Sequence, residues 1–351
     1  MLEALAPGAY LDLEPMYTTP EWQLWQGTRA SDRASVILKV PGTHAGGVRT
    51  LARYHREYKL LRDLDCTSVV SAIALHPDPT HPVLVLSQPK GSVPLRTLGV
   101  LAPEAAVGVC MGIANALEQL HAAGVVHLAV SIDNILVSAT GPVSLLGLDV
   151  ASRLGDDGLA PQRMHPTSSA LATMAPEQTG RMNRAVGPGA DLYALGVVLH
   201  ELLSGELPLQ ADDVIGWVHA HIAAPPRPLP PSIPSALRQV VGKLLEKAAD
   251  DRYPSARSLA ADLADVLERL RSGDNSPFEP ARDGVSARFR LSPRLYGREP
   301  DAERLRAAFE RAAAGGRELL LVSGWSGIGK TALVHETHRP LTQRHGRFCM
   351  G

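Results

Sequence analysis

The spacing of hydrophobic positions predicts a strand-rich unit at the start of this chain and helices after it. Residues 9–88 have the pattern of several strands with one helix. The last of these strands is the apolar run Val83–Leu86, and the helix is the amphipathic stretch from about Val48 to Leu64. From 103 to 126, apolar residues recur at helical spacing and predict a long helix.

Glycine and proline punctuate the part that follows. The cluster Val186–Gly189 precedes a helix that we expect to be buried and to end near Gly205. The proline-rich stretch Ala224–Pro231 has two interpretations, a connection wrapped on the surface and a ligand for an SH3-like partner, and the first is the usual role of such loops. Another helix is predicted from about Ser255 to Arg271.

Composition adds the domain organisation. With 351 residues the chain has room for two domains, a complete one at 1–271 and part of another at 293–351, joined by a linker at 272–292. The hydrophobic content of 45% suffices for a core, and the net charge of −1 gives no electrostatic reason to expect nucleic acid or a membrane as partner. Nothing resembles a signal peptide or a membrane-spanning run, so we expect a cytoplasmic protein.

Cysteine and histidine give no metal signature. Cys66, Cys110 and Cys349 are scattered and have the character of reduced interior thiols. His219 and His221 are close in sequence, but their spacing on a helix points them apart. No metal site is expected from these residue types.

The stretch His127–Asn134 resembles the catalytic loop of protein kinases, H-R-D-L-x-x-x-N. In that loop the Asp accepts the proton of the substrate hydroxyl and the Asn holds a magnesium ion. The His and the Asn of the pattern are present, but its Arg, its Asp and the Lys that often follows are replaced by Leu128, Ala129 and Ser131. An alanine methyl cannot accept a proton. We therefore expect His127 to be a structural hydrogen-bonding residue, and Asn134 is the remaining candidate for a magnesium ligand.

The metal-binding motif of kinases, D-F-G, shows a matching loss in the stretch Val143–Leu154. Aligned on the following Ala151–Leu154, the triplet reads Gly147-Leu148-Asp149, and Gly147 offers no carboxylate to magnesium. In the alternative alignment, a slip of two residues places Asp149 in the metal position, on the same face of a strand.

Other kinase landmarks follow in the family's order. Lys39, in Val36–Val40, resembles the strand lysine that neutralises the ATP phosphates, and Glu57 stands where the family has its helix partner. Lys39 has two interpretations, a salt bridge with Glu57 or a contact with ATP. The segment Leu13–Trp22, where kinases have their glycine-rich loop, contains no glycine, so backbone amides cannot approach phosphates closely.

Architectural residues of the kinase fold are present. Ala175-Pro176-Glu177 resembles the A-P-E motif, and Asp191 begins the predicted buried helix. Arg252 falls where kinases place the arginine that pairs with the Glu of A-P-E, so a buried Glu177–Arg252 bridge is expected.

A second phosphate-binding signature lies near the end of the chain. It matches the P-loop pattern G-x-x-x-x-G-K-[ST] and consists of Gly324, Gly327, Gly329, Lys330 and Thr331. The run Glu318–Ser323 is predicted to be a buried strand before the loop, and a helix is predicted to begin at Thr331. Loop amides would surround the phosphates of ATP, Lys330 would reach the β and γ groups, and Thr331 would bind Mg²⁺.

The order of these motifs resembles bacterial hybrid signalling proteins, in which a serine/threonine-kinase-like domain precedes an AAA or STAND-type P-loop ATPase and often a sensor histidine kinase. The sequence segments that carry this resemblance are Ala175–Arg184, Leu295–Glu299 and Leu320–Lys330. The resemblance implies an α+β bilobal kinase-like fold, with a small lobe at about 9–88 and a large lobe at 89–271, followed by the truncated start of an α/β P-loop domain. It implies protein partners and downstream domains of the same longer chain.

Three functions are compatible with these features. In the first, the kinase-like domain is a pseudokinase that serves as a regulatory or interaction platform for the ATPase that follows. In the second, it is an active serine/threonine kinase in which Asp133 or Asp149 substitutes for a missing group. In the third, the activity is ATP-dependent switching by the P-loop module, and the first domain senses a partner. The losses at Ala129, Ser131 and Gly147 favour the first, which is compatible with the third.

Overall fold

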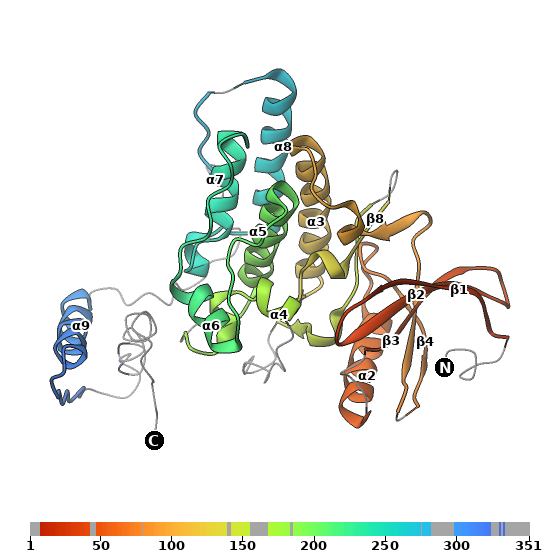
Figure 1. Cartoon of the computed structure of the whole chain (residues 1–351), viewed down its shortest axis with the longest axis horizontal. Helices are drawn as coiled ribbons and strands as arrows, with labels where there is room; N and C mark the ends of the chain where they lie inside the picture. The colour runs from red at the N-terminus through yellow and green to blue at the C-terminus, as the bar shows by residue number, and fades with distance from the viewer. Residues whose placement is uncertain are drawn as a thin grey trace.

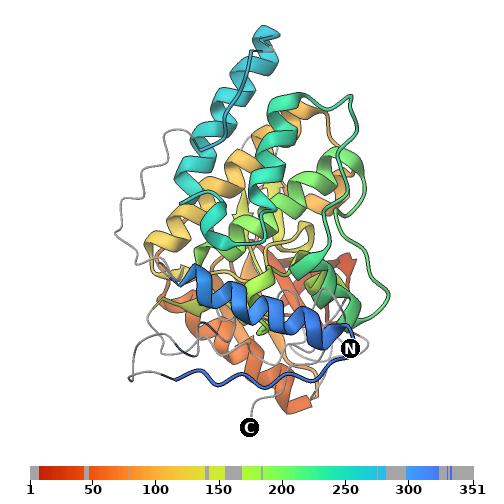
Figure 2. The same ribbon diagram turned by 90° about the vertical axis from the view of Figure 1, so that its left-hand side faces the viewer.

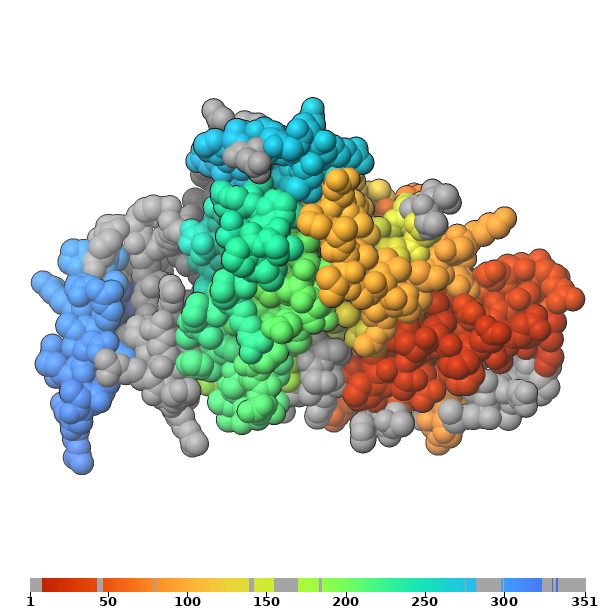
Figure 3. All heavy atoms as spheres, turned by 45° about the horizontal axis from the view of Figure 1, so that its top comes forward, coloured from red at the N-terminus to blue at the C-terminus, as the bar shows by residue number. Residues whose placement is uncertain are grey.

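The computed structural model of the chain describes residues 8–42, 47–78, 80–138, 142–154, 168–182, 185–274, 276–281 and 298–323, together with 330 and 333. These residues form a small lobe built on a sheet, a large helical lobe and a separate helix (Figure 1). In Figure 3 the small lobe (red) and the separate helix (blue) lie at opposite ends of the molecule.

The small lobe is a five-stranded antiparallel sheet in the order β1-β2-β3-β5-β4 with one helix beside it. Its elements are β1 Tyr10–Thr18, β2 Trp22–Arg29, β3 Ser35–Pro41, α2 Gly47–Asp63, β4 Ala72–His76 and β5 Val83–Ser87. The central strand β3 is buried on both faces from Val36 to Pro41, which explains its unbroken apolar run around one lysine. The helix predicted from about Val48 to Leu64 is confirmed as α2.

The large lobe is mainly helical and lies above the small lobe in Figures 1 and 2. Its helices are α3 Pro103–Ala122, α4 Ser168–Thr173, α5 Pro188–Ser204, α6 Val214–Ala223, α7 Ser235–Leu244 and α8 Ala256–Ser272. Its short strands are β6 Ser92–Pro94, β7 Val125–Val126, β8 Ile135–Ser138, β9 Ser144–Leu145 and β10 Ser152–Arg153. Its 3₁₀ turns are η1 Leu95–Leu98, η2 Ile132–Asn134, η3 Leu148–Val150, η4 Pro176–Thr179 and η5 Ala249–Asp251. As predicted, α5 is buried around most of its circumference.

The proline-rich stretch 224–231 is a wrapped connection. The N–H of Arg227 donates to the carbonyl of Pro208 at 2.7 Å, and the carbonyl of Arg227 contacts His200 Nε2 at 3.0 Å. Leu229 is buried. These contacts fasten the stretch to the lobe, so its prolines serve the packing of the loop.

The P-loop segment departs from the prediction in one element. The run Glu318–Ser323 is not a strand, and Leu319 and Leu321 are 87% and 89% exposed, so the prediction of a buried strand is wrong. A buried strand needs neighbours to pair with, and residues 298–323 contain only the helix α9 Glu299–Ala313 as a regular element. Lys330 and Leu333 have helical backbone, as predicted for the helix after the loop.

Among the described helices, none has the length and apolarity that a membrane span needs.

A buried bridge ties the large lobe together. Arg252 donates through Nη1 and Nη2 to the two carboxylate oxygens of Glu177 at 2.7 and 2.9 Å, and both side chains are buried. The same guanidinium donates to the carbonyls of Gly189, Glu246 and Lys247. The bridge joins η4, the start of α5 and η5, as the sequence predicts.

We expect Arg252→Met to lower the free energy of unfolding by about 3–5 kcal/mol, because it strands the buried Glu177 carboxylate. The double variant Glu177→Gln with Arg252→Met should recover part of this loss. The matched control is Arg271→Met, whose side chain is 66% exposed. Chemical denaturation checks the prediction, and equal losses for Arg252→Met and the control would contradict it.

Candidate nucleotide cleft

The catalytic-loop backbone is kept in place by Asp191 of α5. Its Oδ2 accepts the N–H of His127 at 2.9 Å and contacts His121 Nε2 at 2.8 Å, and its Oδ1 accepts the N–H of Leu128 at 2.7 Å. Leu128 has φ 63°, a strained value for a branched side chain, and these bonds stabilise it. His127 Nε2 contacts the carbonyl of Leu146 at 3.1 Å, so its role here is structural. The loop therefore has its conformation fixed without help from a ligand.

The loop has alanine at the position of the family's proton-accepting aspartate. Ala129 contributes only backbone groups: its N–H donates to His127 Nδ1 at 3.3 Å, and its carbonyl accepts Asn134 Nδ2 at 2.8 Å. Ser131 is buried. Asn134 Oδ1 is buried and has no hydrogen-bond partner among the described residues. Asp133, one candidate substitute for the base, forms an ion pair with Arg96 at 2.8 Å. Burial raises the pKa of Asp133, and Arg96 opposes that rise.

Gly147 occupies the position beside Asn134, where the unslipped alignment places the first residue of the metal motif. Its φ of 81° is left-handed, and a Cβ at this position would collide with the side chain of Asn134. The structure therefore gives the unslipped register, and the two-residue slip that would put Asp149 beside Asn134 is wrong.

Asp149 instead joins a cluster of four charges. Lys39 Nζ lies 2.7 Å from Glu57 Oε2 and 3.4 Å from Asp149 Oδ1, and Arg53 Nε donates to Asp149 Oδ2 at 2.8 Å. Glu57 also accepts the N–H of Leu148 at 3.0 Å. The structure thus brings Lys39 and Glu57 together and adds a carboxylate from η3 and a guanidinium from α2.

The cluster fixes the ionisation of its members. Burial alone would raise the pKa of Asp149, but Lys39 and Arg53 outweigh it and hold that pKa below its usual value. Burial alone would lower the pKa of Lys39, but Asp149 and Glu57 outweigh it and raise that pKa. Both groups therefore remain charged and paired inside the cleft. Sequence reasoning missed Arg53, although its place four residues before Glu57 on one helix face was a usable signal.

The residues of this cleft do not fit the magnesium ion that a kinase active site holds. Gly147 supplies no oxygen ligand beside Asn134, and the carboxylate of Asp149 is engaged by two cations. Among the described residues no group of three or more His, Cys, Asp or Glu side chains is placed to hold a metal. A lone amide oxygen is too little for a cation that prefers near-octahedral oxygen coordination.

The turn between β1 and β2 places side chains in the cleft where kinases have glycines. Trp22 is 7% exposed, and its ring centroid lies 5.6 Å from Lys39 Nζ. Glu21 is half-buried beside the charge cluster, and its Oε1 has no hydrogen-bond partner among the described residues. Burial raises the pKa of Glu21 to about 7, with Arg53 opposing the rise and Asp149 adding to it.

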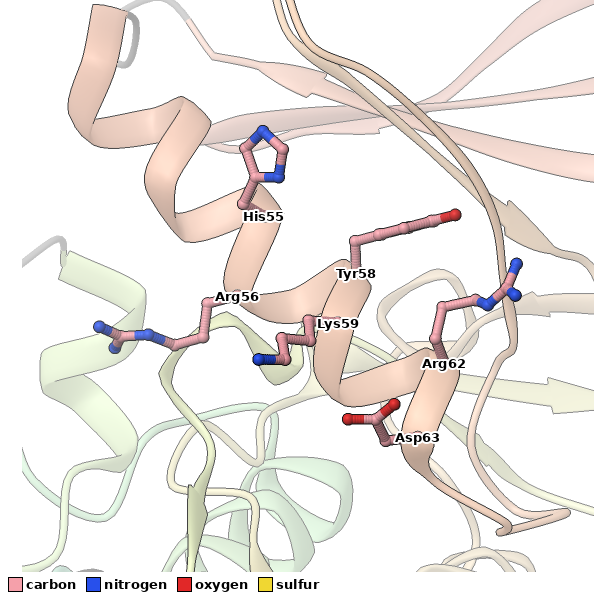
Figure 4. A pocket seen from close by; sticks show the side chains of 6 residues that line it. All are labelled: His55, Arg56, Tyr58, Lys59, Arg62 and Asp63. Atoms are coloured by element: carbon pink, nitrogen blue, oxygen red, sulfur yellow. The ribbon is translucent and has the colours of Figure 1, made fainter.

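The outer face of α2 is basic and turned away from the cleft. His55, Arg56, Lys59 and Arg62 line a shallow exposed hollow there (Figure 4). Helical spacing puts His55, Lys59 and Arg62 on the side of α2 opposite Glu57. These cations therefore do not contribute to a phosphate site in the cleft.

The second predicted site lies largely outside the described residues. Gly324, Gly327, Gly329 and Thr331 belong to that part of the chain, whereas Lys330 is described and half-buried. The P-loop assignment therefore remains a prediction from the motif.

Comparison with known families agrees with this arrangement of lobes and loops. The model of the protein kinase domain matches residues 24–263. The chain belongs to the protein kinase family. The model of the AAA ATPase domain matches residues 294–351, which include the P-loop motif.

Curated relatives match parts of the chain. The chain is 37% identical over 211 residues to serine/threonine-protein kinase PknD of Mycobacterium tuberculosis, and 31% identical over 246 residues to serine/threonine-protein kinase Pkn1 of Myxococcus xanthus. These alignments cover 55% and 66% of this chain and 31% and 34% of the relatives. The chain is also 32% identical over 194 residues to hybrid signal transduction histidine kinase G of Dictyostelium discoideum. That alignment covers 48% of this chain and 6% of the relative. The chain therefore spans a third or less of most of these relatives' lengths.

The raised pKa of Glu21 gives a prediction about pH. The folded protein binds this proton more tightly than the unfolded chain, so the contribution of Glu21 to stability is complete below the usual pKa of glutamate and is lost as pH rises through about 7. Glu21→Gln stays neutral, and we expect its free energy of unfolding to fall less than that of wild type between about pH 5 and pH 8.

Denaturation curves at a series of pH values measure the difference. Glu14→Gln, at an exposed position of the same hairpin, is the control and should follow wild type. Parallel curves for Glu21→Gln and wild type would show that Glu21 is not buried as described.

Proposed function

We propose that the kinase domain of this protein is a pseudokinase, which serves as a regulatory or interaction module for the ATP-binding P-loop segment that follows it. The observation that carries the proposal is Ala129, which stands at the base position of a loop whose conformation Asp191 preserves. Since the loop keeps its shape, the missing proton acceptor reflects the side chain alone and not a local rearrangement.

The two carboxylates that might replace the missing groups are engaged elsewhere. Asp133 pairs with Arg96, and Asp149 pairs with Arg53 and Lys39. A carboxylate whose pKa is held low by two cations is a weak proton acceptor. Lys39 is therefore a structural partner of Glu57 and Asp149 in this proposal, not a phosphate-binding residue.

The nucleotide belongs to the P-loop in this proposal. The match of the AAA ATPase domain to residues 294–351 supports ATP binding there. Gly324, Gly327 and Gly329 would surround the phosphates, Lys330 would contact the β and γ groups, and Thr331 would bind Mg²⁺. The partners of the kinase domain would be proteins, including further domains of the same chain. The net charge of −1 speaks against nucleic acid.

The alternative is an active serine/threonine kinase with atypical catalytic residues. Two observations favour this alternative. The carboxylate of Asp149 lies in the cleft at Lys39, and the bacterial relatives are named serine/threonine-protein kinases. Positioning supplies much of phosphoryl-transfer catalysis, so the loss of a base alone is survivable. The combined loss of the base, the ligand at Gly147 and the glycine loop weighs against it.

A transfer assay with γ-labelled ATP decides between the two. We expect the purified chain to label itself and generic protein substrates only at background level, with Lys39→Met causing no further fall. We also expect a fluorescent ATP analogue to bind the chain, with Lys330→Ala reducing its affinity by at least about tenfold, or about 1.4 kcal/mol.

Lys59→Met is the matched control for both lysines, since Lys59 is exposed on the outer face of α2. Labelling above background that disappears in Lys39→Met and persists in Lys59→Met would overturn the pseudokinase proposal. Analogue binding that survives Lys330→Ala would move the nucleotide away from the P-loop.

A further inference from the structure

The region around Lys39 is closed by the protein's own side chains. The Lys39 side chain is 1% exposed, and its ammonium group is within hydrogen-bonding reach of Glu57 and Asp149. The rings of Trp22 and Tyr54 lie 5.6 and 5.5 Å from Nζ and cover it from two further directions. The ammonium group of Lys39 is therefore enclosed by side chains of the protein itself.

The charges at this place do not favour a phosphate either. With all four groups ionised, the positive charges of Lys39 and Arg53 balance the negative charges of Glu57 and Asp149, and the cluster has no net charge. The carboxyl of Glu21 lies within electrostatic range of both cations and of Asp149. When ionised, it turns the local balance negative and repels a triphosphate.

The turn that carries Glu21 and Trp22 is built as a rigid unit. The backbone N–H of Thr19 donates to the carbonyl of Trp22 at 2.8 Å, and Thr19 Oγ1 accepts the N–H of Trp22 at 3.2 Å. The carbonyl of Glu21 accepts the N–H of Gly42 at 2.8 Å. A Cβ at Gly42 would collide with the backbone of Pro20, so this glycine permits the end of β3 to close on the turn.

Tyr17, near the end of β1, connects this hairpin to the large lobe. Its hydroxyl donates to the carbonyl of Asp133 in η2, and its ring packs edge-on against Trp22 at 5.1 Å. The guanidinium of Arg96 lies 5.3 Å from the Tyr17 ring and also pairs with the carboxylate of Asp133. These contacts cross from one lobe to the other.

Apolar packing closes the rest of the interface. Trp22, Leu24 and Ile37 of the small lobe belong to the same buried cluster as Leu136 and Leu146 of the large lobe. Leu24, Ile37, Leu136 and Leu146 are completely buried. On the face drawn in Figure 3, the small lobe (red) directly adjoins the large lobe.

We propose that Glu21 and Trp22 form an internal plug that occupies the cleft at Lys39 and excludes nucleoside triphosphates from it. The inference rests on the proposed function and deepens it: the kinase domain lacks transfer chemistry and also lacks a free nucleotide site. We call Tyr17 the latch of the plug, because its hydroxyl donates a hydrogen bond from this hairpin to η2 and so holds the hairpin against the large lobe.

The test measures binding of a fluorescent ATP analogue, without magnesium, to chains of residues 1–351 that all carry Lys330→Ala, which removes the P-loop contribution. The parent chain should show no saturable binding. The plug variant Glu21→Gly with Trp22→Val should bind saturably, at least about tenfold more tightly than the weakest binding that the assay detects, and adding Lys39→Met should abolish that binding. Valine keeps an apolar strand former at the first position of β2.

Trp25→Val is the control, because Trp25 is in the same strand but on the opposite face of the sheet from Trp22. It should bind like the parent. If thermal unfolding shows that the plug variant is unfolded, Tyr17→Phe provides the second test: it keeps the ring, removes the latch and should also raise affinity.

Each outcome distinguishes the two proposals. Lys39-dependent binding by the parent chain, or no gain in folded plug and latch variants, overturns the plug. If the parent binds but transfers no labelled phosphate, the plug alone fails and the pseudokinase proposal stands. If the parent both binds and transfers phosphate, both proposals fail.

Discussion

The arrangement of the cleft depends on the neutralisation of one buried charge, the ammonium group of Lys39. An isolated ammonium in the interior is strongly destabilising, so it needs partners. Glu57 and Asp149 provide them, and each is fixed in turn, Glu57 by the N–H of Leu148 and Asp149 by Arg53. This chain of contacts ties β3, α2 and η3 into one unit. Glu57 and Asp149 thus give Lys39 the negative charge that the phosphates of a bound nucleotide would otherwise provide.

The fold is maintained by charges that do not take part in chemistry. Asp191 orders the catalytic loop by accepting two of its backbone N–H groups and also contacts His121 of α3, and Arg252 ties η4 to η5 through Glu177. Replacing one partner of such a set leaves a buried charge unpaired, whereas Ala129 at the position of the catalytic aspartate leaves no buried charge without a partner. In the proposed pseudokinase, this asymmetry explains how the kinase fold persists without the family's catalytic groups.

The sequence predicts helices that have a clear hydrophobic period, and it predicts ion pairs whose residues stand at known positions of the kinase motifs. The helix at α2, the pairing of Lys39 with Glu57 and the Glu177–Arg252 bridge all have such signals. The position of Asp149 was left between two alignments, because only the left-handed turn at Gly147 decides which residue lies beside Asn134. The position of the Trp22 ring over Lys39 depends on the register in which β2 pairs with β3, and no local hydrophobic pattern records that register. The run Glu318–Ser323 looked like a buried strand because apolarity alone does not reveal whether neighbouring strands are present.

Hydrogen exchange of the full chain, with and without Mg-ATP, tests most directly whether the kinase cleft is filled by its own residues. If it is, added nucleotide should increase protection around residues 324–333 and leave the amides of β3, the β1–β2 turn and η3 unchanged. Nucleotide-dependent protection of Lys39 in β3 and of Leu148 in η3 would contradict the account, because it would show that ATP reaches the charge cluster.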